Sequence, residues 1–220
     1  HVLMPLGAAD LERLDTVVPL PGTVAGRGEI ALLDNRANGQ ITALWRALAA
    51  GASAEIAAAA FTVEGRDWPA GTLIVRGGRA AIERSARELG FDATLVRRAA
   101  APAGSPHVAG VPRVALYRSW NASMDEGWTR WVFEQLGVSY VTVTDSTIRQ
   151  GGLRSRFDVV ILPSETDSAI ATGRRANTAP AAYTGGLGRE GTEALRAFLA
   201  DGGTVIALDE ALKLVLQQGV

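Results

Sequence analysis

The chain has 220 residues, a formal net charge of -1, two histidines and no cysteine. Without cysteine there is no disulfide framework, no Cys-ligated metal site and no cysteine nucleophile, and two histidines are too few for a multi-histidine metal site. The balanced charge argues against a nucleic-acid groove, which needs a basic stripe. No apolar run approaches the roughly 20 residues of a membrane span, so we expect no membrane-spanning segment.

Residues 1–28 are expected to be a linker or irregular, because residues 17–28 contain several prolines and glycines, which favour turns and loops. The chain has no initiator methionine, and its first residues do not have the charged and apolar regions of a signal peptide. We therefore expect it to be part of a longer polypeptide.

Residues 29–98 alternate between predicted strands and helices. The run 29–35 is apolar and ends in polar residues, as a buried parallel strand does. Asn35 or Asn38 is expected to cap the helix that follows, and Gly51 to end it. The remaining predictions are strands over 55–63, 72–75 and 93–96, a turn over 66–71 and a helix over 79–89. This alternation predicts a small β/α segment with a largely parallel sheet.

Residues 99–112 are the strongest linker candidate, because they contain three prolines and two glycines. We expect a boundary there between the small β/α segment, 29–112, and a second domain, 113–220.

The second domain repeats the alternation and contains a buried-strand pattern at 158–162. Ser123 or Asn121 is expected to cap its first helix. The expected strands are 113–117, 141–144, 158–162 and 204–208, and the expected helical segments are 125–136, 148–153, 190–199 and a stretch from 209. Residues 164–188 are expected to form a long polar loop. This order predicts an α/β fold, a doubly wound parallel three-layer sandwich.

Polar residues follow three of these strands, and ligands of doubly wound sheets bind beyond the carboxyl ends of strands. The candidate ligand-binding residues are Arg118, Trp120, Asn121, Ser123, Asp125, Glu126, Ser164, Glu165 and Asp209. One interpretation is ordinary helix capping and ion pairing. A second is a crevice for a small polar ligand, a sugar or an amino acid. A third is a hydrolase that uses Asp125, Glu126, Glu165 or Asp209 as acid and base groups.

Two tryptophans and one glycine-rich loop need separate interpretations. Trp128 and Trp131 are three residues apart, so they share a helix face. They are expected to pack in the core or against a neighbouring domain, with a ligand platform as the alternative; an exposed pair would favour an interface. Residues 184–188 lack the Lys-Ser/Thr of a phosphate loop, and we expect them to lead the chain into the helix at 190.

Several segments of 113–210 resemble a known protein family. They are 113–120 (Arg-Val-Ala-Leu-Tyr-Arg-Ser-Trp), 123–132 (Ser-Met-Asp-Glu-Gly-Trp-Thr-Arg-Trp-Val), 156–163 (Arg-Phe-Asp-Val-Val-Ile-Leu-Pro), 183–188 (Tyr-Thr-Gly-Gly-Leu-Gly) and 202–209 (Gly-Gly-Thr-Val-Ile-Ala-Leu-Asp). This set resembles the C-terminal region of large bacterial zinc carboxypeptidase-like proteins, which are carboxypeptidase A-type metallopeptidases. That region is similar to a class I glutamine amidotransferase-like, flavodoxin-like domain. Residues 29–98 resemble the stretch that links it to the peptidase domain.

The resemblance implies a domain without its own catalysis. The family's zinc site, a His-x-x-Glu with a later His and a catalytic Glu, has no counterpart in this chain, so we expect zinc only in the peptidase domain of the parent and no catalytic residue, metal or cofactor here. Amidotransferases carry a Cys after a strand, where this chain has Leu208, Asp209 and Glu210, so no thiolate can form. We expect an accessory domain, cut short at its C-terminus, that packs on the peptidase domain of a periplasmic or secreted bacterial protein.

Overall fold

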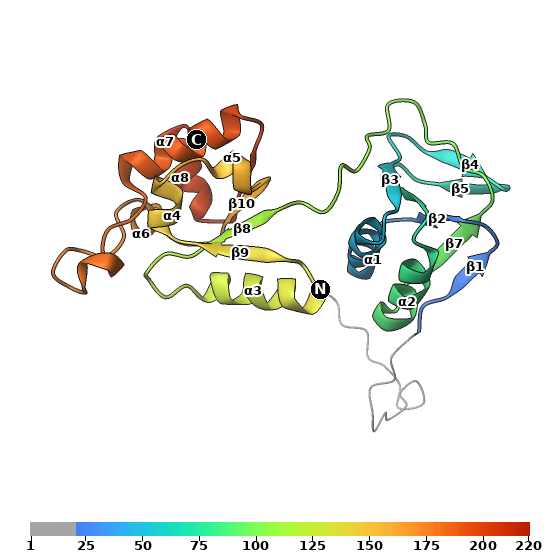
Figure 1. Ribbon diagram of the computed structural model, residues 1–220, viewed down its shortest axis with the longest axis horizontal. Coiled ribbons are helices and arrows are strands. Elements are labelled where there is room, and N and C mark those ends of the chain that lie inside the picture. The colour runs from blue at the N-terminus through green and yellow to red at the C-terminus, as the bar shows by residue number, and fades with distance from the viewer. Residues whose placement is uncertain (1–20) are drawn as a thin grey trace, which may run out of the picture. The chain divides into compact units, whose positions relative to one another are not determined.

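The chain is built of two α/β units, which divide between Val108 and Ala109 (Figure 1). The computed structural model describes residues 21–220, so residues 1–20 of the expected linker lie outside the described part. The division between the units falls within the residues 99–112 for which a linker is expected. Each unit has its own sheet and its own buried core.

The first unit has a five-stranded mixed sheet in the order β1-β7-β2-β6-β3. Its strands are β1 (Val24–Gly26), β2 (Ile30–Leu33), β3 (Ser53–Ile56), β6 (Leu73–Arg76) and β7 (Ala93–Val96). Only β1 and β7 pair in parallel, whereas β2 pairs antiparallel with both β6 and β7, and β3 pairs antiparallel with β6.

Both faces of this sheet are covered. Helices α1 (Asn38–Ala49) and α2 (Arg79–Leu89) pack on the face that presents Leu33, Val75 and Leu95. The opposite face presents Leu32, Ile74 and Val96 to the hairpin of β4 (Phe61–Val63) and β5 (Arg66–Trp68). Side chains alternate between faces along a strand, so one sheet serves two apolar clusters.

Several expectations for the first unit are wrong. The strand expected over 55–63 is divided between β3 and β4, and the turn expected over 66–71 begins with β5. The sheet is not largely parallel, because the β4–β5 hairpin reverses the chain and returns β6 antiparallel beside β3. Within the irregular segment expected over 1–28, residues Val24–Gly26 form β1, which pairs with β7. Neither asparagine caps α1: its N-cap is Ala37, and the Gln40 side chain accepts a hydrogen bond from the Arg36 backbone N–H at 2.9 Å. By contrast, the helix over 79–89 and the strand over 93–96 are confirmed residue for residue.

The second unit has a four-stranded sheet that is parallel throughout, in the order β11-β10-β8-β9. Its strands are β8 (Val114–Tyr117), β9 (Tyr140–Val143), β10 (Val159–Leu162) and β11 (Thr204–Ala207). The helices are α3 (Met124–Leu136), α4 (Asp145–Arg149), α5 (Leu153–Arg156), α6 (Asp167–Ala171), α7 (Gly188–Ala200) and α8 (Ala211–Gln218), with a 3-10 turn, η2 (Ala181–Tyr183). The parallel sheet expected for this unit is confirmed.

Helices lie on both faces of this second sheet, with α3 on one side and α4, α7 and α8 on the other (Figure 1). The larger core joins Tyr117, Leu162 and Phe198. The smaller core joins Leu116 and Ile161 to Phe133 of α3. The start of α3 is as predicted, because Ser123 accepts a hydrogen bond from the Glu126 backbone N–H at 3.2 Å.

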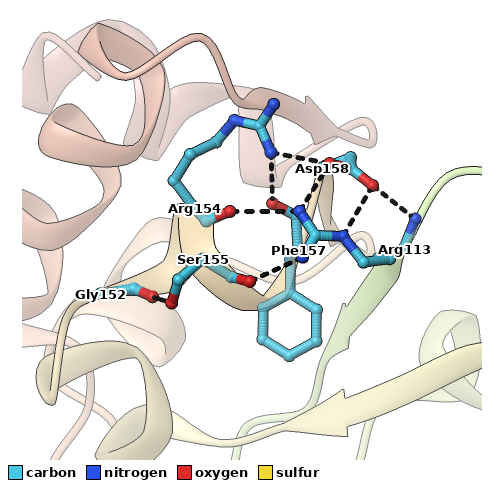
Figure 2. A network of polar contacts seen from close by, with 6 residues as sticks. All are labelled: Arg113, Gly152, Arg154, Ser155, Phe157 and Asp158. Atoms are coloured by element: carbon cyan, nitrogen blue, oxygen red, sulfur yellow. Dashed lines mark hydrogen bonds and ion pairs between the residues drawn. The ribbon is translucent and has the colours of Figure 1, made fainter. Parts of the chain in front are cut away.

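A polar network ties together the beginnings of the two central strands (Figure 2). The Arg113 guanidinium donates to both carboxylate oxygens of Asp158, at 3.0 Å from Nε and 2.8 Å from Nη2, and the Arg113 backbone N–H donates at 2.9 Å. Arg154 adds a bond to the same carboxylate at 2.7 Å. These bonds hold the pKa of Asp158 well below its usual range. The network therefore fixes β8 against β10 at the sheet edge opposite their carboxyl ends.

Candidate functional site

A pocket of about 500 Å³ lies at the carboxyl ends of β8 and β10. From β8 the chain continues to β9 on one side of the sheet, and from β10 to β11 on the other side. Such a reversal of strand order leaves a crevice where doubly wound sheets bind ligands. Pocket residues contributed by the loops after the two strands include Arg118, Ser119, Trp120, Asn121 and Glu165.

The loop after β8 is held by its own hydrogen bonds. Ser119 is only 4% exposed, and its hydroxyl accepts from the Asn121 backbone N–H at 3.0 Å while it donates to Glu165 Oε1 at 2.7 Å. Trp120 packs edge-on against Tyr183, with ring centroids 4.7 Å apart. Ser119 therefore fixes the Glu165 carboxylate in the pocket, and η2 supports the loop from outside.

The inner part of the site is acidic. The Tyr117 hydroxyl donates to Asp145 Oδ1 at 2.6 Å, and both side chains are buried. Burial raises the pKa of Asp145, although its bond from Tyr117 and the charge of Arg149 act in the opposite direction. Burial, and then the charge of Asp145, raise the pKa of Glu165, while its bond from Ser119 opposes this shift. A second negative charge is therefore costly here unless a cation offsets it.

The outer part of the site is basic. Arg118 and Arg174 line the pocket and are exposed, and within the described residues neither guanidinium makes an ion pair. The Arg118 guanidinium lies 5.9 Å from the centre of the Trp120 ring. Arg130 is already engaged, because it pairs with Glu126 and donates to Tyr140 Oη at 3.1 Å. Two arginines are therefore free to receive an anionic group.

The nine predicted residues separate into two concavities. Six of them line the pocket: Arg118, Trp120, Asn121, Ser123, Glu126 and Glu165. The other three, Asp125, Ser164 and Asp209, line a neighbouring groove of about 360 Å³ beside Trp128. In that groove Ser164 Oγ donates to Asp209 Oδ2 at 3.0 Å. The four carboxylates considered for acid–base catalysis thus do not form one cluster.

Sequence reasoning missed Tyr117, Asp145, Arg130 and Arg174. Asp145 could have been found from the rule that polar site residues follow the carboxyl ends of strands, since it stands two residues beyond the end of β9. Arg174 could not, because it comes from the middle of 164–188. This segment was expected to be a loop throughout, but it contains α6 and η2, and Arg174 lies between them. The segment between α6 and α7 closes on itself where the Gly185 backbone N–H donates to the Arg174 carbonyl at 2.8 Å.

The glycine-rich segment 184–188 serves close backbone contact. A Cβ at Gly186 would lie 2.4 Å from the Ile170 carbonyl oxygen, so no other residue fits without a shift. The Arg149 guanidinium donates to the Gly186 carbonyl. Helix α7 begins at Gly188, slightly before the predicted start at 190. The segment thus packs against α6 and leads into α7.

Trp128 and Trp131 lie on the surface of α3. They are 59% and 52% exposed, with ring centroids 5.8 Å apart in an edge-to-face arrangement. Met124 on the same helix is 77% exposed. The core-packing interpretation of the tryptophan pair is therefore wrong, and the exposed arrangement is the one that favours an interface.

Residues 21–220 contain no group of three or more His, Asp or Glu side chains arranged as a candidate metal site. No helix within the same range is long and apolar enough to cross a membrane. His107 is exposed, and its Nε2 lies 3.8 Å from Glu55 Oε1.

Comparison of the chain with protein-family models, with curated proteins and with solved structures found no match.

Proposed function

We propose that this chain is a non-catalytic part of a bacterial zinc carboxypeptidase-like protein, and that residues 109–220 are an amidotransferase-like accessory domain that packs on the peptidase domain. The exposed apolar face of α3 carries the proposal. The string Met-Asp-Glu-Gly-Trp-Thr-Arg-Trp, the most specific part of the sequence resemblance, forms the first two turns of this helix. Its Met124, Trp128 and Trp131 are exposed, and such a cluster on a surface helix is typical of a protein–protein contact.

The topology supports the flavodoxin-like assignment within this proposal. Numbered by their order in the chain, the four parallel strands lie as 2-1-3-4 across the sheet. Flavodoxin-like sheets have the order 2-1-3-4-5, so the four strands match the first part of it.

The backbone after β11 supports the amidotransferase-like assignment. Asp209 stands between β11 and α8 with a φ of 47°, a left-handed conformation that is uncommon outside glycine. Nucleophile elbows are strained strand-to-helix turns of this kind. A carboxylate stands at this position in place of a thiol, in keeping with a domain that holds the fold without the glutamine-hydrolysing chemistry.

The coding sequence next to the chain tests this assignment directly. If the chain belongs to such a protein, the same reading frame continues upstream of His1 and encodes a His-x-x-Glu motif and a later His. Within the longer protein, replacing Trp128 and Trp131 with serine should lower the melting temperature of the peptidase domain. The matched control replaces the exposed Arg189 and Glu193 of α7 and should leave that temperature unchanged. A stop codon immediately upstream, or equal effects of the two double variants, contradicts the proposal.

A second candidate function is a small-ligand-binding module, and the pocket at the carboxyl ends of β8 and β10 favours it. Its volume falls within the range of roughly 300–1,000 Å³ typical of small-molecule sites. A thermal-shift screen of the 220-residue chain against sugars and amino acids tests this function, because a ligand that binds only the folded state raises the melting temperature. No shift with any of them contradicts the module.

A further inference from the structure

We propose that the pocket at the carboxyl ends of β8 and β10 binds a free α-amino acid, with its ammonium group on Glu165 and its carboxylate on Arg118 and Arg174. The inference rests on the second candidate function, the small-ligand-binding module, and names its ligand class. It follows from two sets of unpaired charge that line one pocket. One set is the Glu165 carboxylate, and the other is the guanidinium groups of Arg118 and Arg174.

Glu165 is the group that would bind the ammonium. Its carboxylate is half-buried and fixed by the bond from Ser119, and within the described residues no lysine, arginine or histidine pairs with it. The buried Asp145 adds a second negative charge nearby, which is one cause of the raised pKa of Glu165. A bound ammonium would relieve both the burial and the repulsion, because an opposite charge favours the ionised carboxylate.

Arg118 and Arg174 are the groups that would bind the carboxylate. Each presents a planar set of N–H donors that matches both oxygens of a carboxylate. They come from separate loops, the one after β8 and the one between α6 and η2. Arg118 contacts the Trp120 ring, and Trp120 in turn packs against Tyr183. These contacts position Arg118 at the pocket.

The opposed charges distinguish a zwitterion from other ligands. A sugar has no charge to place on either set, so it leaves Glu165 and the arginines uncompensated. A phosphate would be repelled by Glu165 and Asp145, and a polyamine by Arg118 and Arg174. An amino acid carries one charge of each sign, so it has a partner for each set, and a pocket of about 500 Å³ has room for its side chain.

Calorimetric titration of the full chain with the twenty amino acids, with glucose as the sugar probe, is the first step of the test. The tightest amino acid is then compared with its analogue without the amino group and its analogue without the carboxyl group. We expect each analogue to bind about tenfold more weakly or worse, since one set of charges is left unpaired.

Variants locate the site. Glu165→Gln and Arg118→Gln should each weaken binding of the amino acid about tenfold or more. Asp167→Asn and Arg175→Gln change charges just outside the pocket lining and should leave binding unchanged. Circular dichroism confirms that each variant is folded before it is titrated.

The outcomes separate the two hypotheses. Glucose binding without amino acid binding, or a deaminated analogue that binds as tightly as the amino acid, overturns the amino acid proposal and leaves the binding module standing. Binding of none of these probes overturns the amino acid proposal, and together with no thermal shift from the other sugars it overturns the binding module. Unchanged binding in Glu165→Gln and Arg118→Gln removes the ligand from this pocket.

Discussion

Replacing Asp158 with asparagine should destabilise the second unit by about 2 kcal/mol at pH 7. The carboxylate accepts two bonds from the Arg113 side chain, one from the Arg113 backbone and one from Arg154 (Figure 2). A hydrogen bond to a charged group contributes about 1.5–3 kcal/mol when sheltered from water, whereas an exposed ion pair contributes roughly 0–1 kcal/mol. The side chains of Asp158, Arg113 and Arg154 are 34%, 48% and 38% exposed. Asp158 takes part in two such exposed pairs, with Arg113 and Arg154, and at up to about 1 kcal/mol each they give about 2 kcal/mol.

The assay is a urea titration of the full chain at pH 7, with hydrogen exchange followed on peptides from 109–220. With a dependence on urea of roughly 1–3 kcal/mol per molar, the midpoint should fall by roughly 1 M. Asp201→Asn is the control, because this exposed carboxylate has no side-chain partner in residues 21–220. The free energy of unfolding of this control should change by no more than about 0.5 kcal/mol.

The stabilisation of the fold by the Asp158 carboxylate should depend on pH in one direction. The pKa of Asp158 is lower in the folded state than in the unfolded chain, where it is about 3.9. The stabilisation is therefore fully present above that value and is lost as the pH falls through it toward the lowered folded pKa. The difference between the wild type and Asp158→Asn should shrink below about pH 4. A difference under about 0.5 kcal/mol at pH 7, or one that stays constant between pH 7 and pH 3, would refute the reasoning.

Three further predictions concern single side chains of the second unit. Glu165→Gln should stabilise the fold at pH 7, because the folded pKa of this carboxyl is raised: its cost is absent below the unfolded value of about 4.3 and grows as the pH rises through the folded one. Chemical denaturation at pH 4 and pH 7 measures this, and a variant that is less stable at pH 7 contradicts it. Asp209→Val should cost at least about 1 kcal/mol more than Asp209→Gly, because a β-branched residue is strained at a φ of 47°; equal melting temperatures would show that the turn relaxes. Ser123→Ala should cost about 1 kcal/mol through loss of the α3 N-cap, whereas Ser123→Asp should retain most of the stability, as urea midpoints will show.

The elements with clear local signals were predictable. Helix α2 combines an amphipathic pattern with Gly90 as its left-handed C-cap, and its bounds follow from these two features. The direction of the strands in the first unit was less accessible. The β4–β5 hairpin turns at Glu64 and Gly65, both at positive φ, yet Glu-Gly is a weaker turn signal than Asn-Gly. Strand β1 has three residues, so its pairing with β7 is decided by the tertiary structure.

The candidate site was predictable where chemistry follows a strand. The loops after β8 and β10 were found from this rule, and they supply most of the polar pocket residues. Arg174 reaches the same pocket only because glycines let the long loop approach α6 closely, which no spacing in the sequence reports. The exposure of Trp128 and Trp131 was also undetermined, since helical spacing places two side chains on one face without saying what covers that face.

We propose that the apolar face of α3 is covered by a peptidase domain in a longer polypeptide. Because the chain has no cysteine, Val132→Cys introduces a single thiol on this face, and Arg189→Cys introduces one on the exposed surface of α7. The measurement is the rate of maleimide labelling of each thiol, in the 220-residue chain and in the longer protein. We predict that labelling at position 132 slows about tenfold or more in the longer protein while labelling at 189 is unchanged. Equal rates at position 132 in the two proteins would contradict the claim.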